Sequence, residues 1–150
     1  MTHELLQPRS WPRPKGYANG MAARGRLVFI AGQIGWDAQG KFPSKSLAGQ
    51  VRQALANIVA VLTEAGGRPE HLVRLTWFVL SRDGYYQELR EIGAAYVEVL
   101  GKHFPTMSVV QVVALMESEA QVEIEATAVI PDEASDSTIK LPAHGHLASA

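Results

Sequence analysis

Two carboxylates near the end of the chain, Glu123 and Glu125, have the spacing of neighbours on one face of a β-strand. Successive strand side chains alternate between faces, so Val122, Ile124 and Ala126 point the other way. A carboxylate in a cleft can hold a water molecule as a general base, whereas an unpaired buried charge is costly. The segment is therefore expected to line a site or to seal an interface.

Glu123 has two interpretations that the sequence leaves open: a base that positions water, or half of an ion pair across a subunit boundary. Glu125 is expected to be structural, bonded to backbone groups or to a basic residue such as Arg74. No cofactor and no metal site are predicted. His144 and His146 have no partner ligands nearby in the sequence.

The hydrophobic pattern predicts an α+β domain in which two helices cover one face of a single mixed sheet. The expected element order is β-β-α-β-α-β-β. The elements span residues 17–21, 26–31, 46–65, 72–80, 85–100 and two strands within 103–130. The first two strands are expected to pair as a hairpin. In the strand 72–80, Leu72 is expected to share a face with Arg74, Thr76 and Phe78.

Residues 1–131 are predicted to form one domain, in which proline-rich residues 1–16 are an N-terminal arm. Residues 132–150 are small and polar, which is typical of a flexible C-terminal tail. The chain has no apolar run long enough to span a bilayer and no recognisable targeting signal, so a cytoplasmic location is expected.

Composition excludes several functional classes. The 150 residues include no cysteine, which excludes disulfides and cysteine nucleophiles, and the formal net charge of −1 gives no general attraction for nucleic acid.

Several strands are apolar on both faces, although the two helices can cover only one face of the sheet. Self-association is the simplest way to cover such a surface.

Two segments resemble the C-terminal signature of the RidA/YjgF family, which includes reactive-intermediate deaminases and proteins formerly labelled endoribonuclease L-PSP. They are the runs Phe104-Pro105-Thr106-Met107-Ser108 and Val122-Glu123-Ile124-Glu125-Ala126. Gly16-Tyr17 and Ala31-Gly32-Gln33-Ile34 extend the resemblance over roughly residues 15–130. The resemblance implies a homotrimer with small-molecule clefts between subunits.

This sequence departs from the deaminase branch at three positions. That branch has an arginine two residues after the proline, and its guanidinium grips the substrate carboxylate; here the position is Met107. The usual serine is Ala31 and the usual cysteine is Val109. A thioether has no charge and accepts hydrogen bonds only weakly. These changes argue against 2-aminoacrylate as the substrate.

The resemblance implies Glu123 as the catalytic residue, positioning water or the ligand amine. It also implies substrate-binding roles for Tyr17, Gly32 and Gln33, with Met107 on the pocket wall. Alternatives stay open: Tyr17 as an interface residue, Gln33 as a partner for strand-end backbone groups, and Met107 as core. Arg90 could supply the missing positive charge, or could lie on a solvated helix face.

Three functions remain in competition. The first, which we favour, is hydrolysis of a reactive enamine, imine or related compound at clefts between subunits. The second is a non-catalytic, ligand-binding or regulatory trimer. The third, an endoribonuclease, lacks support because the chain has no basic groove with interleaved aromatic residues.

Overall fold

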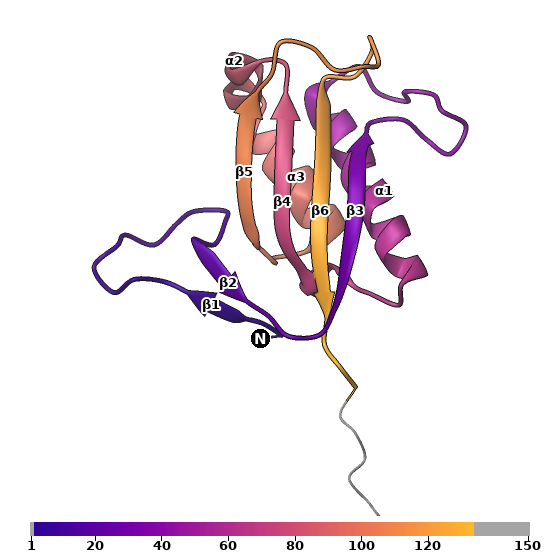
Figure 1. Cartoon of the computed structure of the whole chain (residues 1–150). Helices are drawn as coiled ribbons and strands as arrows, with labels where there is room; N and C mark the ends of the chain where they lie inside the picture. The colour runs from indigo at the N-terminus through magenta and orange to yellow at the C-terminus, as the bar shows by residue number, and fades with distance from the viewer. Residues whose placement is uncertain (1, 134–150) are drawn as a thin grey trace, which may run out of the picture.

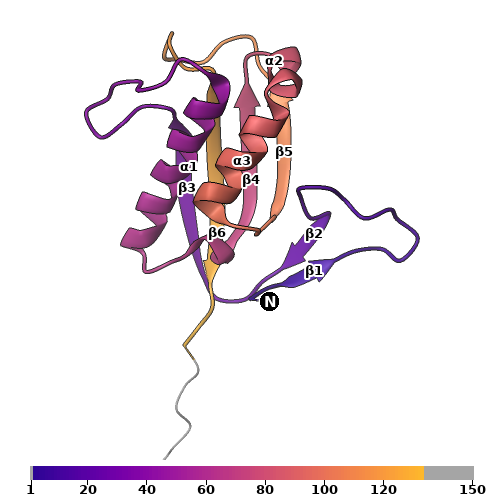
Figure 2. The same ribbon diagram turned by 180° about the vertical axis from the view of Figure 1, so that it is seen from behind.

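The computed structural model describes residues 2–133 and contains a four-stranded sheet with helices packed on one face. Figure 2 shows that α1 and α3 lie side by side over this face, whereas Figure 1 looks onto the face that the helices leave open. This two-layer arrangement confirms the predicted α+β fold.

The elements follow the expected order with one addition, because the predicted N-terminal arm contains a strand, β1, that the hydrophobic pattern did not indicate. The strands are β1 (Glu4–Leu6), β2 (Gly20–Ala22), β3 (Arg26–Ile34), β4 (Leu72–Val79), β5 (Thr106–Gln111) and β6 (Val122–Ile130). The helices are α1 (Leu47–Glu64), the short 3-10 helix η1 (Pro69–His71), α2 (Arg82–Gln87) and α3 (Leu89–Leu100). The helix predicted over 85–100 is therefore two helices that meet at Glu88.

The main sheet has the order β3-β6-β4-β5. Strand β6 is antiparallel to both of its neighbours, and β4 is parallel to β5. The parallel pair is joined by α2 and α3, as a crossover connection requires. Strand β6 is therefore central, and it presents Glu123 and Glu125 on the open face of the sheet.

Local signals account for the position of α1. The Ser46 hydroxyl accepts a hydrogen bond from the Gly49 amide at 3.0 Å, which caps the start of the helix. Gly66, with φ of 77°, follows the end of the helix in the left-handed conformation that glycine tolerates best. Between these ends, the stripe formed by Val51, Leu55 and other apolar residues is fully buried against the sheet.

The predicted hairpin between the first two strands is wrong. Strand β2 pairs with β1, and the resulting two-stranded arm is separate from the main sheet. In Figure 1 this arm extends beside the lower end of β5, on the opposite side of the sheet from β3. The chain between β2 and β3 contains Gly25, at φ of 147°, which lets it cross beneath the sheet instead of reversing directly.

The expected orientation of Leu72 is also wrong. A register shift between Leu72 and Arg74 inserts one extra residue opposite β6. A bulge of this kind reverses the alternation of side chains, so Leu72 joins Leu75 in the core and is fully buried. Arg74, Thr76 and Phe78 share one face of the strand as predicted, because these residues come after the bulge.

The open face of the sheet has exposed apolar side chains at both of its edges. Leu27 is 57% exposed and Phe29 is 75% exposed on β3, and Val110 is exposed at the other edge on β5. An apolar surface of this kind marks an interaction site.

Candidate functional site

A bulge in β3 creates the first part of the candidate site, which we call the bulge site (Gly32, Gln33 and Glu123). The pairing with β6 shifts between Ile30 and Gln33, so β3 carries one extra residue there. Gly32 consequently lies against the Glu123 side chain. A Cβ on Gly32 would overlap the Glu123 carboxylate oxygen and lie 2.8 Å from its Cδ.

Glu123 is half-buried, and its carboxylate has neither a hydrogen bond nor an ion pair with any other residue of the range 2–133. Its neighbour on β4 is Phe78, which offers no polar group. The Gln33 side-chain amide donates to the Ala31 carbonyl at 3.1 Å, the kind of strand-end backbone contact considered above. The carboxylate is therefore free to bind water, a ligand or a second copy of the chain.

Glu125 lies two residues along the same face and is exposed. Together with Arg74, Thr76 and Phe29 it lines a shallow hollow of about 460 Å³ on the open face of the sheet. Within the described chain, no ion pair joins Glu125 to Arg74. The two side chains nevertheless give this hollow one charge of each sign.

A second part of the candidate site lies at the β5 edge, on the helix side of the sheet. We call it the β5 hollow, a space of about 340 Å³ bounded by β5, α2, α3 and the returning N-terminal arm. Its walls are mainly aromatic and aliphatic and include Tyr17, Trp77, Tyr85, Tyr96, Phe104 and Met107. Burial raises the pKa of the phenols of Tyr85 and Tyr96, so both side chains are neutral.

The arm supplies Tyr17 to this hollow through a backbone contact. The Ala18 amide donates to the Pro105 carbonyl at 3.1 Å, and Ala18 forms a parallel bridge with Thr106. Tyr17 remains 43% exposed although it lines the hollow. The arm is therefore part of the candidate site, which its proline-rich sequence alone did not indicate.

Met107 belongs to the β5 hollow and not to the bulge site. It pairs with Leu75, so it points to the helix face of the sheet, whereas Glu123 pairs with Phe78 and points to the open face. One chain therefore does not bring Met107 and Glu123 together. A single small molecule could contact both only if they came from different copies.

Arg90, which was considered from the sequence, and Trp36 are separate from these parts. Arg90 is exposed on α3 and lines neither the β5 hollow nor the bulge site. Trp36 follows β3 and packs against Phe42, with ring centroids 6.3 Å apart. Among residues 2–133, the structure contains no cluster of three or more potential metal ligands and no helix long and apolar enough to cross a membrane. His144 and His146 lie outside the described residues.

Sequence reasoning missed Gln50, which supports the bulge site from beneath. It is 1% exposed, and its side-chain amide donates to the carbonyls of Ser44 and Glu119 at 3.2 and 3.0 Å. Its carbonyl accepts from the Gln121 amide at 2.8 Å. These bonds fix the start of β6 immediately before Glu123. A polar residue within the apolar stripe of α1 was the available signal.

A known protein family matches most of this chain. The family model described as endoribonuclease L-PSP matches residues 11–130, which include both parts of the candidate site. The chain belongs to the RidA/YjgF family. Its RidA/YjgF relatives include a RutC family protein of Synechocystis, which is 32% identical over 87% of this chain and 99% of its own length.

Two other RidA/YjgF relatives extend the comparison. The human 2-iminobutanoate/2-iminopropanoate deaminase is 32% identical over 69% of this chain and 73% of its own length. A crystal structure of a Rid family protein of unknown function from Yersinia pestis covers 87% of this chain and all of its own, with 31% identity and a TM-score of 0.75. The family and the fold are therefore established, and the substrate is a separate question.

Proposed function

We propose that this protein hydrolyses a reactive imine or enamine at sites completed by association of copies of the chain. The observation that carries the proposal is the free Glu123 carboxylate, which lies over Gly32 where the backbone leaves room for it. Membership of a family that includes 2-iminobutanoate/2-iminopropanoate deaminases supports the choice of reaction.

The reaction needs one group that can move a proton twice. Glu123 would take a proton from water as the water oxygen adds to the C=N carbon. The imine nitrogen enters protonated, so the adduct is a neutral carbinolamine. Glu123 would then return its proton to this nitrogen, and the C–N bond would break as the hydroxyl proton passes to solvent, releasing ammonia and leaving a carbonyl product. Imine and water are thus converted to ketone or aldehyde and ammonia, with no oxidant or cofactor required.

Association would combine the two parts. The apolar open face of the sheet, with Phe29 at its edge, supports a second copy packing there, and the family resemblance makes a homotrimer the assembly we propose. In such an assembly, the bulge site of one copy would face the β5 hollow of another. Gly32 and Gln33 would bound the ligand beside Glu123, while Tyr17 and Met107 would bound its far end. Arg90 lines neither part of the site, so the proposal gives it no binding role.

The test is release of ammonia from carboxylate-free imines, which a flavin amine oxidase generates in the assay from primary amines. We expect Glu123→Gln to lower the rate by roughly 10²–10⁴-fold, the range typical of a general acid-base group. Glu125→Gln is the matched control, because it removes a carboxylate from the same strand and face, and it should retain the rate. Equal rates for wild type and Glu123→Gln would refute the proposal.

A second function has one specific observation in its favour. Met107 stands where the deaminase branch has an arginine, so the charged group that would hold a substrate carboxylate is missing. Such a site could bind a ligand without converting it. In that case, Glu123→Gln would weaken ligand binding, and no preparation would release ammonia faster than the protein-free assay.

A further inference from the structure

The β5 hollow has the size and walls of a small-molecule site. Its volume of about 340 Å³ lies within the range of roughly 300–1,000 Å³ typical of such sites. Tyr17, Leu89 and Val109 line it and are each more than a third exposed. Apolar side chains gathered around a concave surface indicate a partner that covers them.

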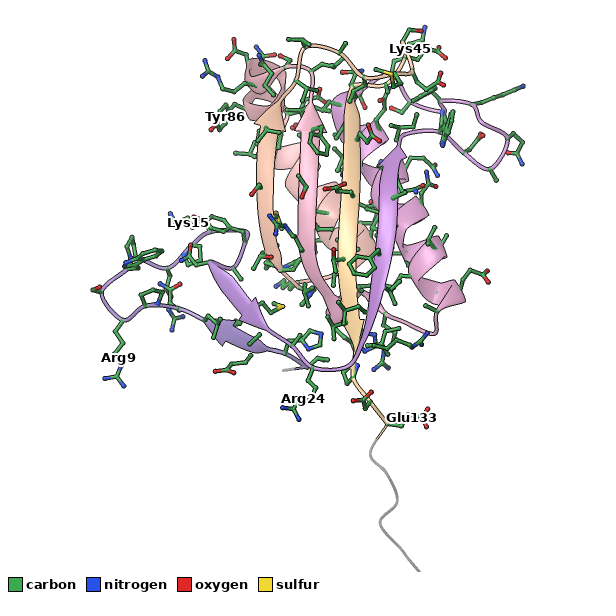
Figure 3. All side chains as sticks on the ribbon, in the orientation of Figure 1. Arg9, Lys15, Arg24, Lys45, Tyr86 and Glu133 are labelled. Atoms are coloured by element: carbon green, nitrogen blue, oxygen red, sulfur yellow. The ribbon has the colours of Figure 1, made fainter. Side chains whose placement is uncertain are left out.

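The walls of the hollow contain almost no charge. Lys15 is the one charged side chain among the lining residues; it is exposed on the returning arm, and Figure 3 shows where that segment approaches β5. At the position on β5 where the deaminase branch has an arginine, this chain has Met107, which packs partly against the core. A desolvated carboxylate would therefore have no fixed partner inside this space.

Gly93 provides an independent indication that the space is used. It lies inside α3 and lines the hollow, although glycine is among the least favourable residues in a helix interior. A Cβ at this position would meet no other atom within 4 Å, so packing within the chain does not require the glycine. The missing side chain leaves the hollow wider than it would be with any other residue.

We propose that the β5 hollow binds an uncharged aryl group, so that the substrate class is aryl-substituted imines whose hydrolysis yields aryl ketones or aldehydes. The stacked rings support this choice: Trp77 lies 6.4 Å from Tyr96, which lies 5.3 Å from Phe104, and an aromatic ligand would extend this series. The inference rests on the proposed function for its reaction, but it concerns binding and can be tested without turnover.

The probes are acetophenone, a stable aryl ketone, and pyruvate, a small keto acid. The reporter is the methyl resonance of Met107 in the full-length protein, with Met116, which is almost fully exposed on a loop, as the internal reference. We expect acetophenone to shift the Met107 resonance selectively and to bind at least tenfold more tightly than pyruvate. An unmoved Met107 resonance at millimolar acetophenone, or tighter binding of pyruvate, would overturn the proposal.

Substitution of Gly93 provides the second measurement. Gly93→Leu should fill the hollow and weaken acetophenone binding at least tenfold, while thermal unfolding stays at or above the wild-type midpoint. Ala94→Leu places the same side chain at the next, exposed position outside the hollow and should bind acetophenone like wild type. Unchanged acetophenone binding in Gly93→Leu would contradict the proposal. Loss of the oligomer in this variant would also contradict it, because that result would mean that a second copy of the chain occupies the hollow. If Gly93→Leu does not fold, the wild-type titration decides.

Failure of this inference and failure of the proposed function give different results. Glu123-dependent hydrolysis without acetophenone binding would refute the aryl ligand alone. Selective acetophenone binding without any imine hydrolysis would refute the enzyme and leave the aryl site in place.

Discussion

Gly32 and Glu123 face each other across the β3–β6 ladder so closely that a Cβ on residue 32 would overlap the carboxylate. The glycine therefore sets where the carboxylate lies. We expect Gly32→Ala to lower imine hydrolysis by at least about tenfold by displacing Glu123. The loss of stability should be small, about 1 kcal/mol, because the glutamate can turn towards solvent. Steady-state kinetics tests the loss of activity, and urea unfolding tests the loss of stability. The double variant with Glu123→Gln should be no slower than Glu123→Gln alone.

Met107→Arg should create an affinity for carboxylates in the β5 hollow. A charge-assisted hydrogen bond contributes about 1.5–3 kcal/mol, and partial exposure places the expected gain near tenfold. Pyruvate binding measured by calorimetry tests this, with Met107→Leu as the uncharged control. Equal pyruvate affinity in the two variants would mean that residue 107 does not contact the ligand.

Phe29→Glu should disrupt association. Phe29 is 75% exposed on the open face of the sheet, and a carboxylate there would have to be buried when copies pack together. Light scattering should give about 49 kDa for wild type, three copies of the 16.3 kDa chain, and a smaller mass for the variant. Tyr86→Glu is the control: Tyr86 is 65% exposed on α2, away from this face (Figure 3), and should leave the mass unchanged. A wild-type monomer would contradict the proposed assembly.

His71 should make the folded state sensitive to mild acid. Burial lowers the pKa of this histidine below its ordinary value of 6.5, and its Nδ1 accepts the Arg68 amide at 2.9 Å, a bond that only the neutral form allows. The unfolded chain therefore binds the proton more readily, and the free energy of unfolding should fall as pH drops below 6.5, with no such effect above it. Urea unfolding at pH 5 and pH 8 gives the free energy of unfolding at each pH, and these two values should differ less for His71→Asn than for wild type. Equal differences would contradict the assignment.

The sequence predicted the elements better than their partners. Periodicity depends on a few neighbouring residues, so the stripe of α1 and the alternation along β6 could be found directly. The pairing of β2 with β1, in place of β3, depends on which strand edges meet in space, and periodicity contains no such information. The orientation of Leu72 failed for a related reason, because one inserted residue in a bulge reverses the alternation that the prediction assumed.

Only some residues of the candidate site, and not its geometry, could be predicted from the sequence, and the roles assigned to them stay predictions. Glu123 and Gly32 do lie together, as motif spacing on paired strands can suggest. The separation of Met107 from Glu123 depends on the parallel register of β5 on β4, which places Met107 opposite Leu75. Gln50 was missed because its role depends on backbone groups of a distant loop.

The placement of Met107 and Glu123 on opposite sides of one sheet has a kinetic consequence. If catalysis needs both residues, the turnover rate per chain should depend on the protein concentration. It should decline on dilution as the copies separate and recover on reconcentration, with a midpoint that reports the dissociation constant of the complex.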